Sequence, residues 1–100
     1  MKEPRLRCII KTPDEFHGHV AYVRNRLKSL QKIVGGYIEC VSIAPGVVLI
    51  CNEDGRYLRL KPNCRVKGID FVGTIVALGV DGEEFADLKT DFEEWMGWLS

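Results

Sequence analysis

Apolar residues near the start of the chain recur at every second position, a spacing that is typical of strands. RLRCIIK at 5–11 alternates in this way and ends at the turn-forming TPDE, so it predicts a first strand. The next residues are ambiguous, because Thr12 could open a long helix. Gly18 and the β-branched and aromatic residues after it favour an extended chain. We therefore expect a second strand over 17–24, paired with the first in a hairpin.

A helical pattern follows this hairpin. Apolar residues recur three to four positions apart, which predicts a short helix over 26–34 with Asn25 as its N-cap. The glycine pair at 35–36 supplies a left-handed end. The apolar stripe of this helix contains Leu27, Leu30, Ile33 and Val34. Its basic face, which we expect in solvent, contains Arg26, Lys28 and Lys32.

Two apolar runs in the middle of the chain predict strands over 37–43 and 47–53. The Asp-Gly pair at 54–55 is a two-residue turn signal, which predicts a hairpin between the second run and residues 56–60. The KPN sequence at 61–63 is then expected to be a turn.

The register of this predicted hairpin sorts its side chains between two faces. Glu53 and Arg56 lie opposite each other beside the turn and form an ion pair across the strands. The face away from the core carries Asn52, Tyr57 and Arg59. Asn52 draws notice because a partly buried amide needs hydrogen-bond partners, which either the backbone or a ligand supplies.

The last third of the chain predicts one strand and one helix. FVGTIVALGV at 71–80 is the most apolar run and predicts a central strand, in which Gly73 allows a bulge or a close approach. Thr90 and Glu93 have the spacing of a capping box, which predicts a C-terminal helix over 91–99. Its inward face contains Phe92, Trp95 and Leu99, and Trp98 is expected to be partly exposed.

Length and pattern together predict the fold class. A chain of 100 residues with 46% hydrophobic residues can bury one core. We expect a single α+β domain over 1–100, with a mostly antiparallel sheet of about five to six strands and the two helices.

Charge is balanced over the whole chain but not along it. The formal net charge is zero, unlike that of a strongly basic nucleic-acid binder. Bases dominate the first third, whereas from residue 68 onward Lys89 is the single base among eight acids. The chain contains no apolar run long enough to span a bilayer, and MKEPRLR lacks the apolar core of a signal peptide. We therefore expect a cytoplasmic protein without membrane contact and with reduced cysteines.

The sequence offers little catalytic or metal-binding chemistry. His17 and His19 could chelate a metal from one face of a strand, but no second, closely spaced ligand pair accompanies them. The strand-like settings of Cys8, Cys40 and Cys51 favour buried packing. The best thiol nucleophile would be Cys8 with His19 across the first hairpin. We predict no metal, no cofactor and no enzymatic activity.

Four motifs carry a resemblance to a known family. They are VGGYIE at 34–39, NEDG at 52–55, LKPN at 60–63 and GT at 73–74. In order and spacing, over residues 25–80, they resemble the domain-of-unknown-function family 3846, small proteins common in phages, plasmids and integrated elements of bacteria. Lys61 departs from the proline usual there. The resemblance implies an α+β fold and a mobile-element context, in which small proteins often block or sequester host components, and it implies no activity.

These observations support three functional hypotheses. The first is an accessory protein that binds a host protein, with self-association through residues 71–80 or Trp98. The second is a protein that binds a small anionic ligand or a nucleotide signal. Its candidate site residues are Arg24, Arg26, Tyr37, Asn52, Tyr57 and Arg59. The third and weakest is nucleic-acid binding by the basic helix face.

Overall fold

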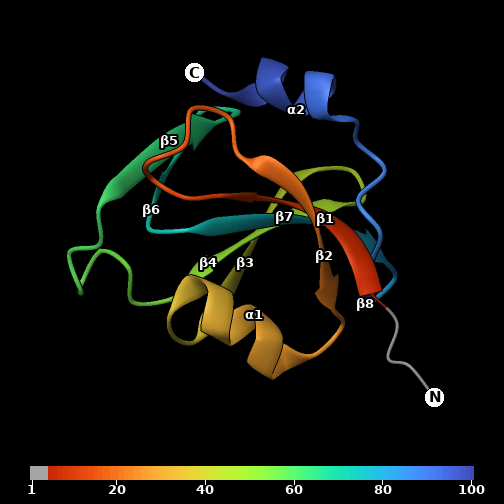
Figure 1. The fold of residues 1–100 in the computed structure, drawn as a ribbon, viewed down its shortest axis with the longest axis horizontal. Coiled ribbons are helices and arrows are strands. Elements are labelled where there is room, and N and C mark those ends of the chain that lie inside the picture. Colours follow the sequence, from red (N-terminus) through yellow and green to blue (C-terminus); the bar gives the residue numbers. More distant parts are fainter. Residues whose placement is uncertain (1–4) are drawn as a thin grey trace.

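The computed structural model describes residues 5–100 and contains strands in the first, middle and last parts of the chain (Figure 1). The strands are β1 (Arg5–Lys11), β2 (His19–Arg24), β3 (Ile38–Ala44), β4 (Val47–Asn52), β5 (Pro62–Val66), β6 (Ile69–Val72), β7 (Ile75–Asp81) and β8 (Glu84–Ala86). The helices are α1 (Leu27–Val34) and α2 (Phe92–Trp98).

One antiparallel sheet forms the centre of the molecule. Within residues 5–100 it contains six strands, in the order β2-β1-β7-β4-β3 with β8 beside β7. β1 and β4 lie on either side of β7, whose residues 75–79 are buried as the run of apolar side chains predicts. β5 and β6 form a separate two-stranded sheet.

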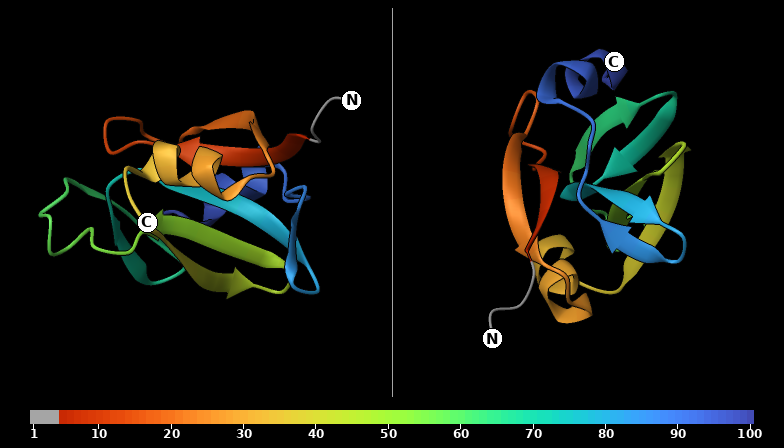
Figure 2. Two further views of the ribbon diagram at one scale, coloured as in Figure 1. Left: turned by 90° about the horizontal axis from the view of Figure 1, so that it is seen from below. Right: turned by 90° about the vertical axis from the view of Figure 1, so that its right-hand side faces the viewer.

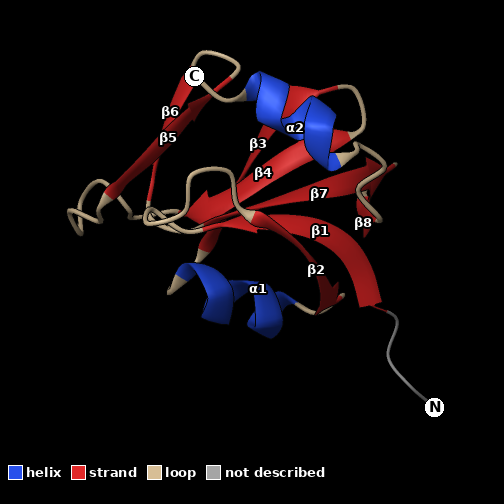
Figure 3. Ribbon diagram, turned by 45° about the horizontal axis from the view of Figure 1, so that its top comes forward, coloured by secondary structure: helices blue, strands red, loops and turns tan. Residues whose placement is uncertain are grey.

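The two faces of the central sheet are covered by different elements. α1 packs on one face, where Leu30 and Val34 join a buried cluster with Cys8 and Ile50. α2 lies on the other side of the sheet together with β5 and β6 (Figure 3). Trp95 of α2 is completely buried there, so the C-terminal helix covers this side of the core, as its apolar stripe indicates.

The predicted fold class is confirmed: the described chain is a single α+β domain with a mostly antiparallel sheet, one short helix and one C-terminal helix. Residues 1–4 of the predicted 1–100 domain lie outside the described residues. Among residues 5–100, no helix has the length and apolarity needed to cross a membrane.

The predicted hairpin around residues 54–55 is wrong. β4 pairs with β3 on one side and β7 on the other, so neither of its edges is available to residues 56–60. The Asn52 side-chain oxygen accepts a hydrogen bond from the Asp54 N–H at 2.8 Å and turns the chain out of the strand direction. Residues 53–60 consequently form a looped segment, and the predicted cross-strand pairs do not form.

The predicted strand over 71–80 is interrupted at Gly73. This glycine has a φ of +73° and separates β6 from β7. A Cβ at this position would lie 2.8 Å from the Leu60 side chain, so the predicted close approach is present. The KPN segment is not a turn, because Pro62 begins β5. A proline is tolerated as the first residue of a strand.

Both predicted helix caps are displaced by one residue. Arg26, in place of Asn25, is the N-cap of α1, and its side chain makes no capping bond. Asp91, in place of Thr90, caps α2 and accepts a hydrogen bond from the Glu94 N–H at 2.7 Å. The left-handed end of α1 is confirmed at Gly35, which has a φ of +80°.

Three predictions of burial or pairing are also corrected. Leu27 belongs to the predicted apolar stripe but is exposed, because it starts α1 at the margin of the sheet. Cys40 is exposed on the edge strand β3, whereas Cys8 and Cys51 are buried as predicted. Edge-to-edge strand pairing of two copies through residues 75–80 is not available, because β7 already has strand neighbours on both edges, whereas self-association itself stays a prediction.

Candidate functional site

The segment between β4 and β5, which we call the 53–60 loop, is held together by its own backbone. The Leu58 N–H bonds to the Asp54 carbonyl at 2.8 Å, and the Leu60 N–H bonds to the Gly55 carbonyl at 3.0 Å. Arg59 adopts a left-handed backbone with φ of +55°. The 53–60 loop projects from the body of the protein (Figure 2, green), so it is a structured protrusion.

Large apolar side chains lie at the tip of this loop. Tyr57 is 87% exposed and Leu58 is 52% exposed. A loop whose backbone is already fixed loses little backbone entropy on binding. The 53–60 loop therefore has the composition and the order of a protein-contact segment.

Asn52 fixes the base of the loop. Its side chain is buried, donates from Nδ2 to the Val34 carbonyl at 3.2 Å and accepts the bond from the Asp54 N–H. A Cβ at Gly36 would lie 2.8 Å from the Asn52 Nδ2, so this glycine makes room for the amide. Asn52 therefore joins the end of α1 to the 53–60 loop by bonding to backbone groups. Of the two roles predicted for its amide, this is the structural one.

A cleft of about 270 Å³, which we call the loop cleft, lies under this loop, between β3, β4 and β6. Four carboxylates and one guanidinium line it: Glu39, Glu53, Asp54, Asp70 and Arg56. The formal charge of these groups is therefore negative. Val41, Tyr57, Ile69 and Phe71 supply its apolar wall. This charge favours a cationic side chain over an anion.

Two groups in the loop cleft have shifted pKa values. Hydrogen bonds from Arg65, at 2.9 and 3.1 Å, hold the pKa of the Asp70 carboxyl below its usual range. Burial, followed by the charge of Glu39, raises the pKa of the Cys51 thiol to about 11. Asp70 therefore stays ionised at neutral pH, and Cys51 stays a thiol unsuited to nucleophilic attack.

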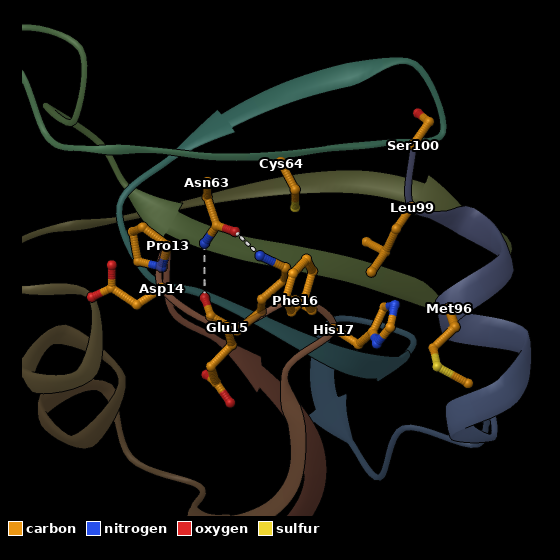
Figure 4. A pocket seen from close by; sticks show the side chains of 11 residues that line it. Pro13, Asp14, Glu15, Phe16, His17, Asn63, Cys64, Met96, Leu99 and Ser100 are labelled. Carbon is orange, nitrogen blue, oxygen red and sulfur yellow. Dashed lines mark hydrogen bonds between the residues drawn. The ribbon is translucent and has the colours of Figure 1, made fainter.

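A second cavity, which we call the lysine pocket, has a volume of about 480 Å³ and lies between the β1–β2 connection, β5 and the end of α2 (Figure 4). Lys11, the last residue of β1, is only 2% exposed. Its Nζ donates to the Asn63 Oδ1 at 2.6 Å and to the Thr12 carbonyl at 3.4 Å. Asn63 also donates from Nδ2 to the carbonyls of Lys11 and Gly73, at 2.8 and 2.7 Å.

The connection that covers the lysine pocket is fixed at several points. The Trp95 indole donates to the His17 carbonyl at 2.7 Å, which ties this connection to α2. The Glu15 carboxylate accepts a bond from the Thr12 N–H at 2.9 Å and lies 2.7 Å from the His19 Nδ1. These contacts, the Thr12 bond foremost, hold the pKa of Glu15 below its usual range.

The six predicted ligand residues do not form one site. Asn52 and Tyr57 line the loop cleft, and the Tyr37 carbonyl adjoins it by accepting a bond from the Glu53 N–H at 2.8 Å. Arg59 belongs to the 53–60 loop but is not among the residues that line the cleft. Arg24 and Arg26 lie at the other end of α1. Anion binding by this set stays a prediction, and the acids of the loop cleft oppose it there.

The two histidines are exposed and Cys8 is buried, as predicted, but His17 lies outside the expected strand. His17 precedes β2, so the pair does not share a strand face, and residues 5–100 contain no cluster that could hold a metal ion. Cys8 is completely buried opposite Ala21, and burial raises its pKa to about 11. This thiol has neither the exposure nor the ionisation of a nucleophile.

Sequence reasoning missed Lys11 and Asn63. The signal for Lys11 was present, because alternation along β1 places it on the same face as the fully buried Ile9. A lysine at an inward position requires hydrogen-bond partners. Asn63 could not be linked to it, since the two residues are 52 positions apart.

Comparison with protein families agrees with the resemblance in the sequence. Residues 6–99 match the family described as Domain of unknown function (DUF3846). The chain belongs to this family. The match extends the resemblance beyond residues 25–80 and includes the strands and helices that form both cavities. Neither a curated protein nor a solved structure shows significant similarity to the chain.

Proposed function

We propose that this protein is a non-enzymatic accessory protein of a phage or plasmid that binds a host protein through the 53–60 loop and the adjacent loop cleft. The observation that carries the proposal is the exposure of Tyr57 and Leu58 on a loop that its own hydrogen bonds keep in shape. Apolar and aromatic side chains on a fixed loop are typical of the energetic centre of a protein interface.

The charge of the loop cleft defines the chemistry of the partner. A partner surface with a lysine or arginine side chain, flanked by apolar groups, complements the carboxylates of Glu39, Glu53 and Asp54. Tyr57, at the rim, can stack on the cationic group. Arg56 is already engaged, since its guanidinium donates to the Asp70 carbonyl at 3.0 Å.

The setting of this activity belongs to the proposal as well. Because the chain resembles small proteins of mobile elements, we propose that the partner is a bacterial host component and that the interaction occurs in the cytoplasm. Self-association also stays a prediction, for surfaces such as that around Trp98. This side chain is partly exposed, and the Lys67 Nζ lies 5.1 Å from the centroid of its ring. Light scattering of the purified protein measures it.

The test is quantitative affinity capture from host lysate with matched variants. The bait is the full chain or its Tyr57→Ala/Leu58→Ala variant, and the control is Tyr22→Ala, which removes another exposed tyrosine on β2. We expect at least one protein to be retained by the unchanged bait and the control and lost from the loop variant. The captured protein is then purified and its Kd measured with all three baits.

The loop variant should lose about tenfold or more in affinity without a change in melting temperature, because neither side chain is buried. A partner that binds the loop variant and the unchanged protein equally would contradict the assignment of this surface.

Nucleic-acid binding by Arg26, Lys28 and Lys32 remains a weaker prediction, and titration of a fluorescent oligonucleotide at two salt concentrations tests it.

A further inference from the structure

The Lys11 ammonium is buried without a countercharge. Within residues 5–100 no carboxylate forms an ion pair with it, and its two hydrogen-bond acceptors are the neutral oxygens of Asn63 and Thr12. An ammonium has three donor hydrogens, and burial of a charge is costly unless the charge is both paired and hydrogen-bonded. We propose that the lysine pocket binds a small carboxylate with an apolar body, whose charge Lys11 neutralises.

The nearby thiol does not supply this countercharge. Cys64 lines the lysine pocket beside Asn63. Burial raises the pKa of its thiol, although the charge of Lys11 acts in the opposite direction. Cys64 is therefore a neutral thiol at neutral pH and contributes a polarisable, mainly apolar wall.

Two acids, Asp14 and Glu15, also line the pocket, but their carboxylates are engaged with other groups. Asp14 pairs with Lys61, and Glu15 is bonded to the Thr12 N–H and His19. Figure 4 shows the carboxylates of Asp14 and Glu15 pointing away from the space between Cys64 and Leu99. An anion that enters on that side meets the ammonium without meeting these carboxylates directly.

The remaining walls explain the apolar body of the ligand. Phe16, Met96 and Leu99 line the cavity together with the His17 ring. Phe16 is 92% exposed and has no packing role in the core, so its ring is free to cover a ligand. A volume of about 480 Å³ accepts a small organic molecule.

A carboxylate fits this pocket better than a phosphate. Among residues 5–100, Lys11 is the one lysine or arginine that lines it, and the nearby Lys61 is paired with Asp14. A single ammonium neutralises a monoanion, whereas a phosphate dianion needs further donors of positive charge. The amide of Asn63 donates to two backbone carbonyls, so it holds the ammonium in position and does not itself recognise the anion.

The test is a two-dimensional ¹H–¹⁵N NMR titration of the full chain with benzoate, the neutral isostere benzamide and phenyl phosphate. We expect benzoate to shift the resonances of residues 13–17, 63–64 and 96–99 and to bind about tenfold or more tightly than either other compound. Equal binding of benzoate and benzamide would overturn the role of the charge. Tighter binding of phenyl phosphate would overturn the choice of a carboxylate.

Two variants and a control locate the site. Lys11→Met keeps the apolar stem and removes the charge, so benzoate shifts should disappear, whereas Lys28→Met on the exposed face of α1 should leave them unchanged. Phe16→Ala removes an exposed ring and cannot disturb the core, so it keeps the test decisive if Lys11→Met does not fold. It should weaken benzoate binding severalfold. Undiminished benzoate binding in Lys11→Met or in Phe16→Ala would overturn the proposal.

Discussion

In the loop cleft the carboxylates of Glu39 and Glu53 are exposed to solvent, whereas in the lysine pocket the ammonium of Lys11 is buried against Asn63. The solvated acids attract a partner at little cost to the fold, because water screens them. The buried ammonium depends on every bond it makes, because its charge has left water. The same small domain thus combines an acid-rich cleft built on a loop with a buried ammonium built into the sheet.

The largest expected effect concerns the bond that holds the buried charge. Asn63→Ala removes the closest acceptor of the Lys11 ammonium and the Asn63 donor to two backbone carbonyls. We expect the free energy of unfolding to fall by about 3–5 kcal/mol, measured by urea denaturation. The exposed Asn25 is the matched control, and Asn25→Ala should change stability by less than about 0.5 kcal/mol.

A double-mutant cycle sharpens this prediction. In a Lys11→Met background, Asn63→Ala should cost less, because no charge is left unpaired. Equal losses of unfolding free energy in the two backgrounds would show that Asn63 stabilises only the backbone carbonyls. The lysine pocket would then not differ from the loop cleft by its dependence on a buried charge.

A smaller loss is expected when the corresponding asparagine of the loop cleft is removed. Asn52 holds only neutral backbone groups, at Val34 and Asp54, so Asn52→Ala should lower the free energy of unfolding by about 1–3 kcal/mol. Binding of the captured partner should weaken only as far as the loop loses its shape. An unchanged melting temperature with complete loss of binding would instead make the amide a ligand contact.

The smallest effects are expected from the pH dependence of stability. The pKa values of Glu15 beside the lysine pocket and Asp70 in the loop cleft are lowered in the folded state. Each carboxylate therefore stabilises the fold above its ordinary pKa, 4.5 and 3.8 respectively, and this contribution is lost as the pH falls through the folded value.

Glu15→Gln and Asp70→Asn should each make the acid-side decline in the urea midpoint slightly less steep. The Asp70 carboxylate is exposed and that of Glu15 is partly exposed, so we expect the changes to be small. A decline as steep as that of the unchanged protein in both variants would show that neither carboxylate contributes to acid unfolding.

Local sequence patterns predicted the parts of the fold that depend on short-range spacing. The first hairpin, the left-handed end at Gly35 and the buried Trp95 all follow from periodicity or from residue type. The hairpin at residues 54–55 failed because its signal is local, while the edges of β4 are occupied by β3 and β7, which come from other parts of the chain. Competition for a strand edge is not visible in a single local pattern.

The candidate sites show the same difference between local signals, which can be read from the sequence, and contacts between distant residues, which cannot. Tyr57 and Asn52 were found because they follow an apolar run at a turn signal, and both line the loop cleft. The lysine pocket was not found, because it combines Lys11, Asn63 and α2 from distant parts of the sequence. The acids of the loop cleft come from β3, the loop and β6, so its negative charge also required the fold.

The most direct test of the proposed docking site uses a ligand that represents the partner's basic side chain. N-acetylarginine methylamide and its neutral citrulline analogue are titrated into the full chain and followed by ¹H–¹⁵N NMR. We expect the arginine compound to shift the resonances of residue 39 and of residues 52–57 and 69–72. The citrulline compound should leave them unchanged, and Tyr57→Ala should weaken the effect. Equal shifts from both compounds, or shifts confined to other surfaces, would contradict the proposed docking site.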